Sequence, residues 1–179
     1  MSRDGLQLHF GRVVNGDFRI MRSTRPSRAD DWLPAVRLTE LNQPGDDYTA
    51  HISAGGLELL MHRREPGADT NLFRAVRGSL TAPWSLPAPI AELNTARGEA
   101  GPFLHISERQ IFFDSNRTGS GDIYTALRDG PDSPFGAPIL VESLSTPAAE
   151  EGLWISDDFG YAVLVRQVAG NWELFEAIR

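Results

Sequence analysis

Hydrophobic residues occur along this chain in short runs, and turn-forming residues separate the runs. In the stretch LQLHF, Leu6, Leu8 and Phe10 alternate with other residues, and a period of two is typical of a strand. The stretch YAVLV (161–165) is apolar on both sides, as expected for a strand that is covered on both faces. No window keeps a helical period over three turns, and 12 prolines and 17 glycines are scattered throughout. The pattern predicts an all-β protein.

One nine-residue phrase recurs as DTNLFRAVR, SGDIYTALR and NWELFEAIR, with a weaker copy in FRIMRSTR. The closing arginines of the four copies are 51 or 52 residues apart, at Arg25, Arg77, Arg128 and Arg179. A second phrase begins with an aromatic residue at the same spacing, at Trp32, Trp84 and Phe135. A third phrase reads AHIS, LHIS and LWIS. A fixed period near fifty residues marks a repeat architecture.

A complete repeat contains four apolar stretches of strand length, which is the pattern of a β-propeller blade. The second and third stretches occur four times, and the first and fourth occur three times. We therefore predict about four four-stranded blades in which the first blade lacks its innermost strand and the last lacks its outermost strand. The predicted repeat units span approximately residues 2–47, 48–101, 102–150 and 151–179.

Incomplete blades would leave strand edges and apolar faces uncovered, which soluble proteins avoid. We therefore expect either self-association or a place within a longer propeller. The simplest self-associated form is a two-fold dimer with about eight blade equivalents. A closed four-bladed monomer is the alternative.

The stretch ISERQIFFDSNRTGSGDIYTALR (106–128) resembles the TolB-type β-propeller repeat. The residues that match the pattern S-x-R-x-G followed by D-I-Y are Ser115, Arg117, Gly119, Asp122, Ile123 and Tyr124. The turn SRDG at residues 2–5 also matches, whereas SAGG and SDDF replace that turn in two other copies. The resemblance implies the propeller fold. It leaves the function open, because such repeats serve scaffolds, periplasmic assemblies and the non-catalytic halves of peptidases.

Histidines and carboxylates supply the candidate ligand groups. His51 and His105 each stand two residues before a serine of the third phrase, and Trp154 takes that place in the last copy. We treat the three as equivalent positions near the central channel. There they pack between blades, or they line a ligand site, or the two histidines bind a metal. Carboxylates precede the first strands, and solvated loops or an acidic ring for a cation are the alternatives. The predicted ligand surface at the channel mouth consists of Asp47, His51, Glu99, His105, Glu151 and Trp154.

The net charge of −7, without a single lysine or a basic cluster, argues against nucleic acid and anionic lipid as partners. The chain has no cysteine and no metal-binding motif, so we expect no metal and no cofactor. No apolar run has the length of a membrane span or of a signal peptide. The sequence as written suits the cytoplasm, and an exported or periplasmic location would require a signal that has been removed.

No nucleophile, base and orienting acid stand in a recognisable motif. The sequence therefore predicts a non-enzymatic binding or interaction scaffold whose ligand surface lies at the channel mouth. The alternative is the propeller part of a hydrolase or lyase with catalytic residues elsewhere or in the channel. A purely structural fragment without a ligand is the third interpretation.

Overall fold

The apolar runs fold into 14 β-strands, and no helix forms, in the computed structural model, which describes residues 1–179. Accordingly, there is no helix that is long and apolar enough to cross a membrane. The strands form four antiparallel sheets, which we call blades 1 to 4. Blade 1 consists of β1 (Gln7–Val14), β2 (Asp17–Thr24) and β3 (Val36–Arg37). Blade 2 consists of β4 (Asp46–Ile52), β5 (Glu58–Arg64), β6 (Thr70–Val76) and β7 (Ala88–Pro89).

Blade 3 consists of β8 (Glu99–Leu104), β9 (Gln110–Ser115), β10 (Asp122–Leu127) and β11 (Ile139–Leu140). Blade 4 consists of β12 (Glu150–Ile155), β13 (Tyr161–Val168) and β14 (Asn171–Ile178). The prediction of four blades, of which the first and last have three strands, is confirmed. The outermost strands β3, β7 and β11 have only two residues each. Prolines in and beside these segments explain their length, because proline cannot donate to a strand ladder.

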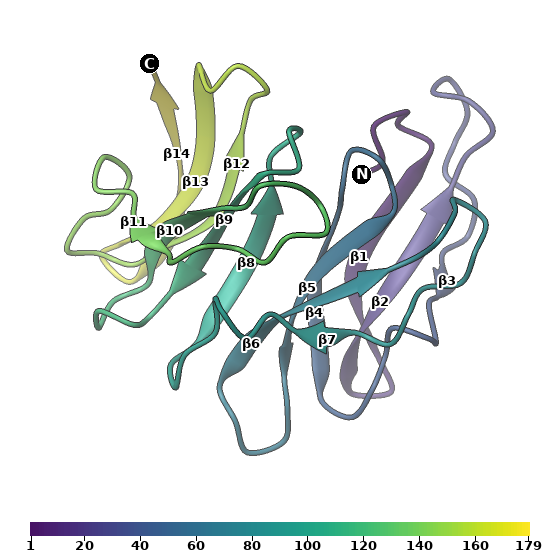
Figure 1. Cartoon of the computed structure of the whole chain (residues 1–179), viewed down its shortest axis with the longest axis horizontal. Coiled ribbons are helices and arrows are strands. Elements are labelled where there is room, and N and C mark those ends of the chain that lie inside the picture. Colours follow the sequence, from purple (N-terminus) through teal and green to yellow (C-terminus); the bar gives the residue numbers. More distant parts are fainter.

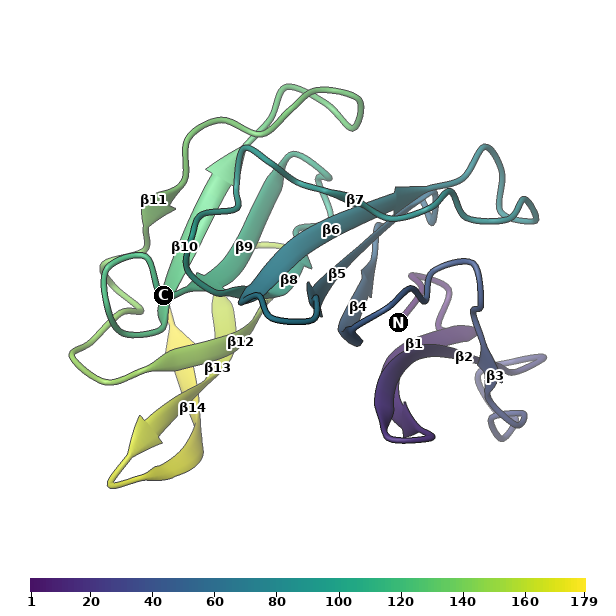
Figure 2. The same ribbon diagram turned by 90° about the horizontal axis from the view of Figure 1, so that it is seen from below.

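The blades follow one another in an open arc, with β4, β8 and β12 side by side along its inner side (Figures 1 and 2). No strand of blade 1 contacts a strand of blade 4. Figure 2 shows the corresponding gap between the first and last blades. The innermost strands therefore line a channel that is open on one side.

Three apolar clusters hold the blades together, one between each pair of neighbours. The pattern is clearest between blades 2 and 3, where Leu72 of β6 is fully buried against blade 3. The next residue, Phe73, points to the opposite face and belongs to the cluster with blade 1. Successive side chains of a strand alternate between faces. The repeated aliphatic–aromatic pair therefore fills two different inter-blade layers, as the sequence pattern indicates.

The repeated arginine and the repeated aromatic residue contact each other. The Nε–H of Arg77 donates to the carbonyl oxygen of Gly56 at 2.8 Å, and its guanidinium lies 4.3 Å from the centre of the Trp84 ring. Arg128 repeats both contacts, with Glu108 at 2.7 Å and with Phe135 at 4.6 Å. Arg25 does so with Gly5 and Trp32. The arginine thus ties the end of the third strand to the turn that precedes the second strand.

Candidate functional site

The turn before the second strand of each blade, here called the blade turn, fixes which residues are equivalent. The N–H of its first residue donates to the carbonyl oxygen five residues later, and its own carbonyl accepts from the fourth turn residue. The first residues of the four turns are Ser2, Ser53, His105 and Ser156. The fourth residue has a positive φ in every turn: Gly5, Gly56, Glu108 and Phe159. The blade turns of neighbouring blades lie at the same end of the channel, which we call the turn end.

The sequence-based equivalence of His51 with His105 is wrong. His105 occupies the position of Ser53, two residues further along than expected. Its Nδ1 lies 3.1 Å from the hydroxyl of Ser107 and its Nε2 lies 3.2 Å from the carbonyl of Asp157. Its ring also stacks on Phe159 with centroids 4.0 Å apart. His105 is therefore a buried residue of its blade turn and of the contact with blade 4.

The true counterpart of His51 is Phe103, and Trp154 holds the same place in blade 4. The three rings come from β4, β8 and β12 and line one hollow of about 190 Å³ at the turn end. The rings of His51 and Phe103 meet edge to face with centroids 4.9 Å apart. Trp154 is 48% exposed, whereas the aromatic residues between the blades are mostly buried. The hollow therefore offers an accessible aromatic surface.

The blade turns add the rim of this hollow through their second residues, Arg3, Ala54, Ile106 and Asp157. Arg3 and Asp157 place one cationic and one anionic side chain beside the apolar wall. Burial lowers the pKa of His51 to about 4, so its ring is neutral at pH 7. A neutral imidazole can both donate and accept a hydrogen bond. The hollow thus combines apolar contact with a few polar groups, which is typical of small ligand sites.

The carboxylates expected in solvated loops or an acidic ring lie inside the innermost strands instead. Asp47, Glu99 and Glu150 are fully buried, so that interpretation is wrong for these three. Asp47 accepts from Arg63 at 2.6 Å, and Glu150 accepts from Arg166 at 2.7 Å. A buried charge requires such a partner. These ion pairs therefore join the first and second strands of a blade.

The six predicted site residues are not brought together. Asp47 and His51 are four residues apart on β4, a separation of about 13 Å at the usual rise of a strand. The carboxylates therefore lie toward the opposite end of the channel from the hollow. Glu151 also lies at that end, beside a bulge of β12. Of the predicted set, only His51 and Trp154 line the hollow.

Sequence reasoning missed Phe103, Arg3, Ile106 and Asp157. A strict period of 51 to 52 residues would have found Phe103, because it lies 52 residues after His51 and 51 residues before Trp154. The tripeptide HIS occurs at residues 51–53 and 105–107, and matching these two copies placed His105 where Phe103 lies.

A buried carboxyl, Asp114 of β9, was also missed. Its side chain accepts a hydrogen bond from the N–H of Gly152 in blade 4 at 3.1 Å. Burial, together with the charge of Glu151, raises the pKa of Asp114 to about 7. His62 holds the corresponding position in blade 2 and accepts from the N–H of Gly101 at 3.2 Å. No group of three His, Cys, Asp or Glu side chains is placed to hold a metal ion.

Neither a protein-family profile nor a curated protein matches the sequence. Among solved structures, a putative TolB from Agrobacterium tumefaciens superposes with a TM-score of 0.65 at 16% identity, over 99% of this chain and 64% of that one. TolB from Acinetobacter baumannii matches with a TM-score of 0.62 at 13% identity, over 98% of this chain and 39% of that one. The chain has a TolB-type β-propeller fold.

A puromycin-hydrolysing peptidase of Mycobacterium tuberculosis also matches, with a TM-score of 0.60 at 17% identity, over 98% of this chain and 28% of that one. The chain spans less than two thirds of each of these three structures. At such identities the likeness concerns the fold. The predicted TolB-type repeat is thereby confirmed as a statement about architecture, and binding sites must be argued from the residues.

Proposed function

We propose that this propeller is a non-enzymatic binding module that holds a peptide segment of a partner protein at the turn end of its channel. The observation that carries the proposal is the hollow lined by His51, Phe103 and Trp154. An apolar side chain of the peptide fits between the rings. Arg3 and Asp157 pair with charged or polar groups on either side of that side chain.

The exposure of Trp154 supports this proposal. Tryptophan is enriched among the residues that dominate protein–protein binding energy, because its large surface is desolvated at little conformational cost. The TolB-type fold supports an interaction role, and the chain offers no recognisable catalytic set. The rival function is the propeller part of a hydrolase or lyase, and the structural similarity to one peptidase supports it. A peptide that binds and stays uncleaved favours the binding module over the hydrolase or lyase.

Selection from a random peptide library tests the proposal. Peptides are selected on the wild-type chain and counted again on Trp154→Ala and Trp172→Ala. Trp172 is the matched control, because it is also 48% exposed and lies on β14, away from the hollow. Since Trp172 shares a strand face with Leu174, which we propose below as a self-association surface, the variants are compared at a concentration at which each is monomeric. We expect enriched peptides to lose at least tenfold in affinity on Trp154→Ala and to keep it on Trp172→Ala. Equal binding to all three proteins would contradict the proposal.

We also propose that a second copy of this chain packs on the outer face of blade 4. Leu174 on that face is 70% exposed, whereas Leu72 and Ile123, which have the same place in blades 2 and 3, are fully buried against the next blade. In blades 2 and 3, apolar residues of the second and third strands pack on the preceding blade. Blade 1 carries Leu8, Phe10 and Met21 at the corresponding positions. The chain therefore contains both halves of an inter-blade contact.

Light scattering across a concentration series tests this association. We expect a dimer at micromolar concentration that Leu174→Glu converts to a monomer. Leu86→Glu is the control, since Leu86 is equally exposed at 70% but precedes the outermost strand of blade 2. A wild-type monomer at all concentrations would reject self-association and would leave the peptide site untouched.

A further inference from the structure

A second site lies between blades 1 and 2, and the equivalent contact between blades 2 and 3 explains it. There, the carboxylate of Glu58 forms ion pairs with two arginines at once. It accepts from both terminal nitrogens of Arg128 in blade 3, at 3.0 and 2.5 Å, and lies 2.7 Å from the Nε of Arg74 in its own blade. Glu58 and Arg128 are almost fully buried. One buried carboxylate thus neutralises two guanidinium groups across this contact.

Between blades 1 and 2, the same three places hold Gln7, Arg22 and Arg77. Gln7 matches Glu58 because each accepts, through its carbonyl, the N–H of the first blade-turn residue. Arg22 matches Arg74 through the strand register. Arg22 lies opposite His9, two residues after Gln7, and Arg74 lies opposite Leu60, two residues after Glu58. Arg77 matches Arg128 through its bond to the fourth turn residue. Both arginines are therefore kept while the acid is replaced by a neutral amide.

The polar atoms at this contact lack partners. The side-chain oxygen of Gln7 and the Nε of Arg22 are buried without a hydrogen bond. The Nε of Arg74 also makes none, but it lies 2.7 Å from the carboxylate of Glu58, whereas Arg22 forms no ion pair. Arg77 is only 7% exposed and uses its Nε for Gly56, while its terminal nitrogens make no hydrogen bond within the protein. Burial lowers the pKa of Arg77, and the charge of Arg22 lowers it further, with no carboxylate acting in the opposite direction. Two positive charges are thus left uncompensated.

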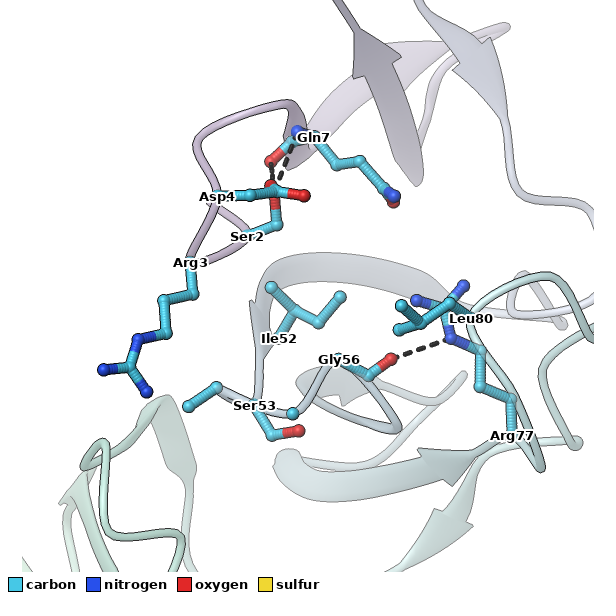
Figure 3. A pocket seen from close by; sticks show the side chains of 11 residues that line it. Ser2, Arg3, Asp4, Gln7, Ile52, Ser53, Gly56, Arg77 and Leu80 are labelled. Atoms are coloured by element: carbon cyan, nitrogen blue, oxygen red, sulfur yellow. Dashed lines mark hydrogen bonds between the residues drawn. The ribbon is translucent and has the colours of Figure 1, made fainter. Parts of the chain in front are cut away.

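A pocket of about 340 Å³ opens at this place, and both Gln7 and Arg77 line it. Figure 3 shows it between the first blade turn, with Ser2 to Asp4, and the second, with Ser53 and Gly56. The one carboxylate on its wall, Asp4, is held by the Ser2 hydroxyl at 2.6 Å and by the N–H of Leu6 at 2.9 Å. Arg3 extends away from Arg77 in this view. The carboxylate of Asp4 therefore leaves Arg77 free for a ligand.

We propose that this pocket binds a small carboxylate, which takes the place that the Glu58 side chain occupies in the next contact. The planar guanidinium of Arg77 matches a carboxylate in two parallel hydrogen bonds, as that of Arg128 does. The amide of Gln7 turns its NH₂ group toward the bound anion. The pocket adjoins the aromatic hollow, and the two share Arg3, Ile52, Ser53 and Ala54. Gln7 and Arg77 line only the pocket, whereas the three rings line only the hollow.

The contact between blades 3 and 4 shows that glutamine alone does not create such a site. Gln110 takes the place of Gln7 there, but Thr125 takes the place of Arg22. The amide of Gln110 donates to the hydroxyl of Thr125 at 3.0 Å. The combination of glutamine with two arginines therefore distinguishes the pocket between blades 1 and 2.

Propionate is the probe, because it carries the carboxylate and two-carbon stem of a glutamate side chain. Propionamide, which corresponds to a glutamine side chain, is the neutral control, and phosphate tests whether any oxyanion suffices. In thermal melts at constant ionic strength, we expect propionate at ten times its dissociation constant to raise the Tm by about 3–6 °C. Propionamide is expected to leave the Tm unchanged. Phosphate acting as strongly as propionate, or propionamide doing so, would overturn the carboxylate assignment.

Two substitutions locate the effect. Gln7→Glu supplies the internal carboxylate, so it is expected to raise the Tm and to abolish the response to propionate. Glu58→Gln removes the carboxylate beside Arg128 and is expected to make the response larger. A response of Gln7→Glu equal to that of the wild type would refute the site.

If either variant fails to fold, the wild-type chain still decides the matter. In a protein labelled with ¹⁵N-arginine, the Nε–H signal of Arg77 is expected to move with propionate and to stay in place with propionamide. An unchanged Arg77 signal at saturating propionate would overturn the proposal without bearing on the aromatic hollow.

Discussion

Leu72→Ala tests the packing between blades most directly. Leu72 is fully buried in the cluster that joins blades 2 and 3, where it lies with Leu60, Leu104 and Ile111. Removing a fully buried leucine side chain costs about 2–5 kcal/mol, since apolar burial is lost and a cavity remains. A chain of this size loses about 2–4 °C of Tm per kcal/mol. We therefore expect the Tm to fall by about 4–20 °C.

Leu127→Ala is the matched control. Leu127 lies on β10, the same strand of the next blade, but it is 61% exposed. Its truncation is expected to change the free energy of unfolding by less than about 0.5 kcal/mol. Both variants are compared with the wild type by thermal melts and by urea titration. A Tm for Leu72→Ala within 2 °C of the wild type, roughly the limit for a surface change, would refute the described packing.

Three further predictions concern single groups. The folded-state pKa of Asp114, about 7, lies above its ordinary value, so the folded chain holds a proton that the unfolded chain releases. The free energy of unfolding from this group therefore falls as the pH rises from about 4 to 7, and Asp114→Asn is expected to melt above the wild type at pH 8 but not at pH 5. For His62 the folded-state pKa is lowered to about 4, so the unfolded chain takes the proton first. Stability from His62 is thus lost as the pH falls from about 6.5 to 4, and His62→Gln is expected to flatten that part of the curve of Tm against pH. Gly56→Ala is expected to cost about 1–2 kcal/mol, because Gly56 has a φ of 72° and an added Cβ would lie 2.8 Å from Leu80. Gly78→Ala, where nothing lies within 4 Å, is the control in the same urea titration.

The architecture could be predicted because the repeats place the same types of core residue at corresponding positions. The residues at positions 72 and 73 recur as an aliphatic–aromatic pair in blades 3 and 4, and one period orders all four blades. The unit boundaries stay a prediction. The innermost strands begin earlier than expected, at Asp46, Glu99 and Glu150, because buried ion pairs extend the ladder toward the second strands.

The site was harder to predict because it depends on small offsets and on contacts between blades. His105 shares its neighbouring letters with His51, yet the hydrogen bonds of the blade turn place it two residues further along. Asp114 has an unusual environment only because Gly152, 38 residues later, meets it from the next blade. The pocket at Arg77 likewise follows from the exchange of a single acid for Gln7. No local motif carries such information.

Nuclear magnetic resonance of the four tryptophan indoles tests the central claim most directly. The chain contains Trp32, Trp84, Trp154 and Trp172, so ¹⁵N-tryptophan labelling produces four indole N–H signals. A peptide selected on the wild-type chain is titrated into this sample. A ligand seated among His51, Phe103 and Trp154 is expected to shift the Trp154 signal and to leave the equally exposed Trp172 in place. A shift of Trp172 with an unchanged Trp154 would contradict a binding site at the turn end of the channel.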